Sequence, residues 1–96
     1  MTNNNTIGIN YSYERLRILV EEYITQQRSS FTLNGVCSYV LYWAMESGHT
    51  TGEHGQIYES DQLQAEDCDR VRCILEKIAR EGRIAATSAG YEKLLN

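Results

Sequence analysis

With 96 residues, the chain has room for one compact domain with a single core, because a chain of this length buries only about 60% of the surface that its unfolded form exposes. Hydrophobic residues at 42% and charged residues at 23% exclude the composition of a disordered protein. The formal net charge of −4 opposes binding to a polyanion through overall charge. No apolar run reaches the roughly 18 residues of a membrane span.

Residues 1–11 are polar, rich in asparagine and without a helical period, which predicts a flexible N-terminal arm. The arm lacks the basic region and the apolar core of a signal peptide. Three cysteines, Cys37, Cys68 and Cys73, are too few for a disulfide framework. These features predict a cytoplasmic protein whose cysteines are small buried hydrophobes.

The first helix is expected from Ser12, a capping residue, to about Arg28. Apolar side chains recur there at spacings of three and four residues, with charged side chains between them. These apolar residues are Tyr13, Leu16, Leu19, Val20, Tyr23 and Ile24.

The second helix is expected to begin after Thr32, a second capping residue, and to end at Gly48. With Val40 at the centre of its inner face, Trp43 falls on the inner side and Tyr42 near the opposite side. The helix is apolar nearly all round. Such a helix either lies at the centre of its own core or lends its second face to a partner.

The segment HTTGEHGQIYESDQ that follows predicts a loop or a short extended hairpin. His49, Glu53 and His54 are residues that can bind zinc, but glycines interrupt their spacing, so a solvated loop is favoured over a metal site. No glycine-rich phosphate loop and no nucleophile with a positioned base is evident. The sequence therefore predicts no enzyme and no cofactor.

The third helix is expected from about Gln64 to Gly82, with one apolar stripe and a charged outer face. A hairpin follows, in which Arg83 to Thr87 and Tyr91 to Leu95 alternate on either side of a turn at Ser88 to Gly90. Two strands of this length require packing against the helices to persist.

This order of elements, with the phrase EGRI before one strand and GY before the next, resembles the winged helix-turn-helix superfamily over roughly residues 12–95. The expected fold is mainly α with a small β-hairpin, namely three helices plus a C-terminal wing in a single domain of residues 12–96. Two features depart from the superfamily pattern. The link between the second and third helices has about 16 residues instead of a tight turn, and three carboxylates (Glu66, Asp67 and Asp69) lie where phosphates would approach.

The resemblance implies that the third helix enters the major groove of double-stranded DNA and that the wing contacts the backbone. It predicts a transcriptional regulator or a DNA-associated accessory protein. Glutamine and arginine can read base edges, and arginine and lysine can neutralise phosphates. The candidate DNA-binding residues are Gln62, Gln64, Asp69, Arg70, Arg72, Cys73, Lys77, Arg80, Thr87, Ser88 and Lys93.

The alternative is a protein-interaction module that uses the winged-helix scaffold without binding DNA, since a fold does not fix a function. The charges of the third helix are then a solvated face with internal ion pairs such as Asp69 with Arg72. In either case a homodimer through the first two helices is expected, because aromatic and methionine side chains are enriched in interfaces. Its candidate residues are Tyr13, Ile18, Tyr39, Tyr42 and Met45.

Overall fold

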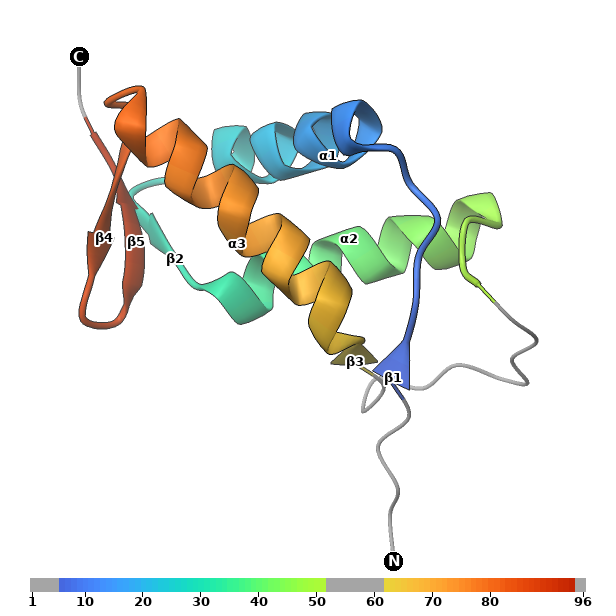
Figure 1. Ribbon diagram of the computed structural model, residues 1–96. Coiled ribbons are helices and arrows are strands. Elements are labelled where there is room, and N and C mark those ends of the chain that lie inside the picture. The colour runs from blue at the N-terminus through green and yellow to red at the C-terminus, as the bar shows by residue number, and fades with distance from the viewer. Residues whose placement is uncertain (1–5, 52–61, 95–96) are drawn as a thin grey trace, which may run out of the picture.

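The computed structural model describes residues 6–51 and 62–94, in which three helices pack together between two small sheets (Figure 1). The helices are α1 (Tyr13–Gln26), α2 (Leu33–Ser47) and α3 (Ala65–Arg80). The strands are β1 (Thr6–Ile7), β2 (Ser30–Phe31), β3 (Gln62–Leu63), β4 (Ile84–Thr87) and β5 (Gly90–Lys93). None of the described helices is both long and apolar enough to cross a membrane.

The predicted capping residues begin the first two helices. Ser12 Oγ accepts a hydrogen bond from the backbone N–H of Arg15 at 3.2 Å, and Thr32 Oγ1 accepts one from Gly35 at 3.0 Å. Gly48 ends α2 in the left-handed conformation, with φ of 74°, as the sequence predicts. The helix α1 ends at Gln26, two residues before the predicted end.

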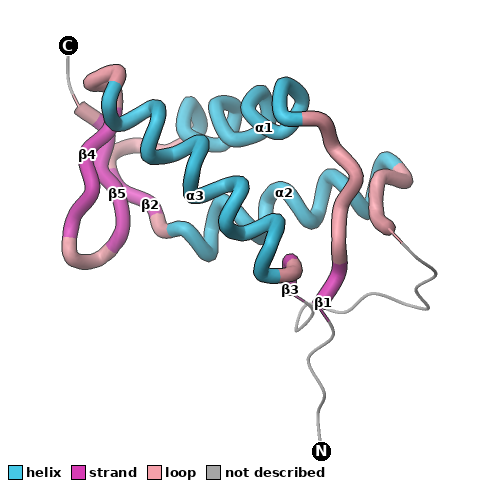
Figure 2. Tube along the Cα trace, in the orientation of Figure 1, coloured by secondary structure: helices cyan, strands magenta, loops and turns pink. Residues whose placement is uncertain are grey.

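The C-terminal hairpin is part of a three-stranded antiparallel sheet in the order β2-β5-β4 (Figure 2). Strand β2, in the link between α1 and α2, pairs Phe31 with Tyr91 of β5. Gly90 is required at the start of β5, because its φ is 147° and a Cβ atom there would lie 2.5 Å from the backbone oxygen of Phe31. The predicted fold of three helices with a C-terminal wing is confirmed.

The N-terminal segment differs from its prediction. Residues 6–11 are not a flexible arm, because β1 pairs in parallel with β3 and the side chains of Ile7, Ile9 and Tyr11 are only 1%, 4% and 7% exposed. The three residues occupy alternate positions, which is the period of an extended strand. Residues 1–5 of the predicted arm lie outside the described residues.

The core lies where the three helices meet, and α3 crosses in front of α2 in Figure 1. Its fully buried members include Leu16, Val20, Val36, Val40, Val71, Ile74, Leu75, Ile78 and Ile84. In α2 the buried face includes Leu41 as well as Val40. The sequence predicts that Trp43 faces inward, but its side chain is 42% exposed. Of the three cysteines, only Cys37 is buried as predicted, while Cys68 is half-buried and Cys73 is exposed.

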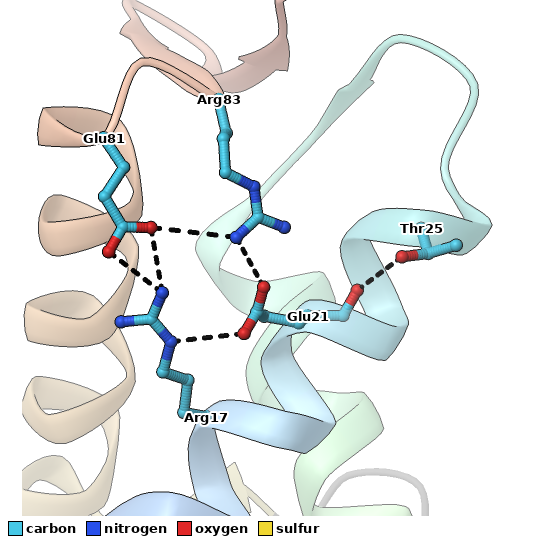
Figure 3. Close-up of polar contacts among 5 residues, drawn as sticks. All are labelled: Arg17, Glu21, Thr25, Glu81 and Arg83. Carbon is cyan, nitrogen blue, oxygen red and sulfur yellow. Dashed lines mark hydrogen bonds and ion pairs between the residues drawn. The ribbon is translucent and has the colours of Figure 1, made fainter.

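Four charged side chains join α1 to the turn between α3 and the wing (Figure 3). Arg17 pairs with Glu21 at 3.2 Å and with Glu81 at 2.9 Å, while Arg83 pairs with Glu21 and with Glu81. We call these four residues the basal network. The basal network holds the start of the wing against α1. Its two arginines, Arg17 and Arg83, are paired with carboxylates of the same chain.

Candidate interaction surfaces

The charges of α3 balance. The helix carries four acidic side chains, Glu66, Asp67, Asp69 and Glu76, and four basic side chains, Arg70, Arg72, Lys77 and Arg80. Three of the acidic residues lie in the first turns and two basic residues lie in the last turn, which suits the helix dipole but places carboxylates at the end that a DNA-reading helix inserts into the groove.

Arg70 holds the N-terminal segment to α3. Its guanidinium donates one hydrogen bond to Asp67 Oδ1 at 3.1 Å and another to the backbone oxygen of Tyr11 at 2.7 Å. The other oxygen of Asp67 accepts from the backbone N–H of Ile9 at 3.1 Å. Asp67 is 3% exposed, and this arrangement satisfies its buried charge. The guanidinium of Arg70 therefore makes intramolecular bonds that a phosphate would have to compete with, although the side chain is 37% exposed.

Three further predicted phosphate contacts also have intramolecular partners. Arg72 pairs with Asp69 at 2.6 Å, the ion pair that the alternative prediction names. Lys77 lies over the ring of Tyr13, 5.9 Å from its centroid. Lys93 donates from Nζ to a backbone oxygen of the α1–β2 link at 3.0 Å.

The remaining candidates are spread over the length of the molecule. Gln62 and Gln64 flank the start of α3, where Gln62 is exposed and Gln64 is half-buried. Cys73 and Arg80 are exposed on α3, and Thr87 and Ser88 are exposed at the tip of the wing. Among the described candidates, these positions therefore extend from β3 along the exposed side of α3 to the tip of the wing.

The second surface is aromatic and lies on α2. Tyr42 is 54% exposed and packs edge-on against Trp43, with ring centroids 5.6 Å apart. Tyr39 also packs against Trp43, at 6.3 Å. We call Tyr39, Tyr42 and Trp43 the aromatic face. Its rings are fixed in position by one another, and the side chain of Tyr39 is further held by Gln26, whose amide donates to the Tyr39 hydroxyl at 3.2 Å.

A hollow of about 300 Å³ opens beside the aromatic face, between α1, the end of α2 and the N-terminal segment. We call it the tryptophan hollow. Its lining residues are Tyr11, Arg15, Leu19, Glu22, Trp43, Ser47 and His49. It combines apolar side chains with one guanidinium and one carboxylate, which lie two turns apart on α1. A volume near 300 Å³ is at the lower end of the range for ligand pockets.

One wall of the tryptophan hollow is a fixed hydrogen-bonded cluster. Tyr11 stacks on His49 at 4.8 Å, and Ser47 Oγ lies 2.9 Å from the Tyr11 hydroxyl and 2.8 Å from His49 Nδ1. Ser47 Oγ also donates to the backbone oxygen of Trp43 at 2.6 Å. These contacts hold Tyr11, Ser47 and His49 together as one wall of the hollow.

The structure brings together some of the predicted dimer residues and separates others. Tyr39 and Tyr42 share the aromatic face, whereas Tyr13 lies beside Lys77 of α3. Ile18 is 47% exposed on α1, and Met45 is half-buried against the core.

The sequence pattern does not reveal the contributions of Trp43, Arg15 and Glu22 to this surface. It places Trp43 on the inner face, and it marks the two charged residues only as polar positions between apolar ones. The spacing of seven residues between Arg15 and Glu22 is the signal that places both on one side of α1. Of the loop residues that can bind zinc, Glu53 and His54 lie outside the described residues. Within residues 6–51 and 62–94, no group of three metal-binding side chains occurs.

Comparisons with known proteins give no match. No protein-family model, no curated protein and no solved structure matches this chain.

Proposed function

We propose that the protein is an interaction module that uses a winged-helix-like scaffold to present the aromatic face to another protein. The single observation that carries this proposal is the exposure of Tyr42 and Trp43, at 54% and 42%, beside the tryptophan hollow. Tryptophan and tyrosine are the residues that most often dominate binding energy in interfaces. The rings are already ordered by their mutual packing, so docking costs little side-chain entropy.

The partner is expected to carry lysine or arginine beside apolar side chains. Two carboxylates flank the aromatic face, Glu22 on α1 and Glu46 on α2, three residues after Trp43, and one guanidinium, that of Arg15, opposes them. Aromatic ring faces also attract cations. A second copy docked through the same face would double the acidic side chains, so charge complementarity favours a basic partner.

The test uses a labelled amphipathic peptide of leucine and lysine, with a matched peptide in which glutamate replaces lysine, and measures fluorescence anisotropy. The protein should bind the basic peptide, and Trp43→Ala should weaken binding at least about tenfold, as expected for a hot-spot residue. Glu22→Gln with Glu46→Gln should weaken binding more than Glu76→Gln with Glu92→Gln, a change of equal charge elsewhere. Equal effects of the two pairs would show that only net charge attracts the peptide and would contradict the proposal.

A second copy of the chain could also dock on the aromatic face, and a further measurement must distinguish this homodimer from a complex with a separate partner. Light scattering of the 11.0 kDa chain at micromolar concentration separates the two. A monomer mass supports a separate partner. A doubled mass that returns to the monomer value in Tyr42→Glu assigns the face to a second copy.

DNA binding is the second candidate function, and the strand order β2-β5-β4 with an exposed wing tip favours it. The phosphate contacts would then come from exposed cations at the end of α3, namely Arg80 and Lys77, although Lys77 also lies over the ring of Tyr13. Anisotropy with mixed-sequence duplexes at about 50 mM salt tests this candidate. Binding that is lost in Lys77→Ala with Arg80→Ala, and kept in Trp43→Ala, supports DNA, whereas no binding of the unchanged protein removes this candidate.

A further inference from the structure

Two cysteines that are far apart in the sequence meet between α2 and α3. Cys37 is buried on α2 at 6% exposure, and Cys68 is half-buried in the first turns of α3. Both line one small hollow of about 160 Å³, which we call the cysteine hollow. Its other lining residues are Asn34, Ser38, Leu41, Gln62 and Leu63.

The two cysteines line the same hollow, and Cys68 is among the groups that influence the pKa of Cys37. Burial raises the pKa of the Cys37 thiol to about 12, and the charge of Cys68 and a side-chain hydrogen bond with Cys68 add to the rise. Cys68 Sγ in turn lies 3.5 Å from the backbone oxygen of Leu63. Cys73 is exposed and does not line the cysteine hollow.

We propose that Cys37 and Cys68 form a dithiol site that reacts with a peroxide and closes to a disulfide between α2 and α3. The cysteine hollow gives a small oxidant a route to Cys68, a half-buried residue that lines it. The buried neighbour, Cys37, then resolves the oxidised sulfur. This inference does not depend on the proposed function.

The reaction balances with hydrogen peroxide as the only co-reactant. The Cys68 thiolate attacks one peroxide oxygen, the O–O bond breaks, and water leaves after protonation, so Cys68 becomes a sulfenic acid. The sulfur of Cys37 then attacks the Cys68 sulfur, releases its own proton, and displaces the hydroxyl as a second water. Two sulfurs are each oxidised by one electron, and the two peroxide oxygens are reduced to two waters.

Because Cys37 is protonated at neutral pH, the second step requires loss of its proton as the S–S bond forms. Closure should therefore be faster as the pH rises. The disulfide would join α2 to the first turn of α3 and hold β3 and the N-terminal segment in place beside it.

The experiment treats the full chain with hydrogen peroxide and follows the intact mass and the positions of the remaining free thiols. The expected product is monomeric, lacks two hydrogen atoms, links Cys37 to Cys68 by peptide mapping, and returns to the dithiol with a reductant. Cys73→Ser, the matched control, should form it at an unchanged rate. Cys68→Ser should not form it and should keep Cys37 unoxidised.

Two checks keep the test decisive. Cys37→Ala, with the native fold verified by circular dichroism, should stop at the sulfenic acid of Cys68, which a dimedone probe captures. A Cys68–Cys73 bridge, a disulfide between chains through Cys73, or no bridge at all in the folded chain would overturn the proposal.

Discussion

At the scale of single residues, the burial and contacts of a charged side chain decide how much it contributes to stability. Asp67 and Asp69 lie two positions apart on α3, yet one is 3% exposed between Ile9 and Arg70, while the side chain of the other is 65% exposed beside Arg72. The buried carboxylate joins two segments of the chain that are far apart in sequence. The exposed one forms a surface ion pair of small energetic weight.

Asp67→Asn should therefore destabilise the protein by about 1.5–3 kcal/mol, because an amide nitrogen would face a backbone N–H or the Arg70 guanidinium. Asp69→Asn should change the free energy of unfolding by less than about 0.5 kcal/mol. Urea unfolding of the two variants provides the comparison. Equal losses would mean that Asp67 does not hold the N-terminal segment.

The basal network should make stability depend on acid pH. Hydrogen bonds from Arg83 and then Arg17 lower the pKa of Glu21 below its ordinary value of 4.5. A lowered pKa stabilises the folded state fully above the unfolded value, and the stabilisation is lost as the pH falls through the folded pKa.

Glu21→Gln should thus cost about 0.5–1 kcal/mol at neutral pH, since the network is partly exposed, and the cost should shrink as the pH falls through the lowered pKa of Glu21. Unfolding at neutral pH and at successively lower acid pH gives the two differences, one for each range. Glu92→Gln, an exposed carboxylate on β5, serves as the control and should change neither. A cost for Glu21→Gln that persists in acid would argue against an ionic origin.

At the scale of elements, the wing depends on one glycine. Gly90 and Gly82 both have positive φ, 147° and 80°, but only at Gly90 would an added Cβ atom lie within 4 Å of backbone atoms. Gly82→Ala should cost about 1–2 kcal/mol for the left-handed conformation alone. Gly90→Ala should cost more and should weaken the pairing of β5 with β2. Thermal unfolding and amide exchange of Phe31 and Tyr91 measure the two effects.

Local chemistry explains which elements could be predicted. Ser12, Thr32 and Gly48 mark helix ends because caps act on neighbouring backbone groups, and the stripe of α3 is clear because one side of this helix faces solvent. Strands β1 and β3 are two residues each, and only the short alternation of Ile7, Ile9 and Tyr11 marks the first of them in the sequence. Their pairing depends on contacts between residues far apart in sequence.

The candidate site could be predicted only in part, for a related physical reason. The helix α2 packs against both α1 and α3, so its buried arc is wide, and a face centred on Val40 alone misplaces Trp43. The sequence pattern does place Arg70 among the polar positions of α3. Its partner, the backbone oxygen of Tyr11, is 59 residues away and leaves no signal in the local pattern.

At the scale of the whole molecule, α3 connects two sheets: the wing lies at its C-terminal end and the β1–β3 pair at its N-terminal end (Figure 1). The N-terminal segment is therefore structural. Ile7→Ala should destabilise the protein by about 2–4 kcal/mol, because Ile7 is 1% exposed. Thr6→Ala, at the exposed neighbouring position, should be nearly neutral. If Ile7→Ala left the free energy of urea unfolding unchanged, the result would support the flexible N-terminal arm that the sequence predicts.

A continuous series of aromatic rings crosses the molecule from the wing to the surface of α2. Tyr91 stacks on Phe31, Phe31 meets Tyr23, and Tyr23 meets Tyr39, with centroid separations of 5.6, 6.0 and 5.3 Å; Tyr39 then leads to Trp43. Trp43 is the single tryptophan of the chain, and it is half-exposed. Light absorbed by the tyrosines of this series should reach its indole by energy transfer, so the protein carries its own optical reporter. Covering of the indole would shift its emission to shorter wavelength, and detachment of the wing would lower the share of emission excited through tyrosine.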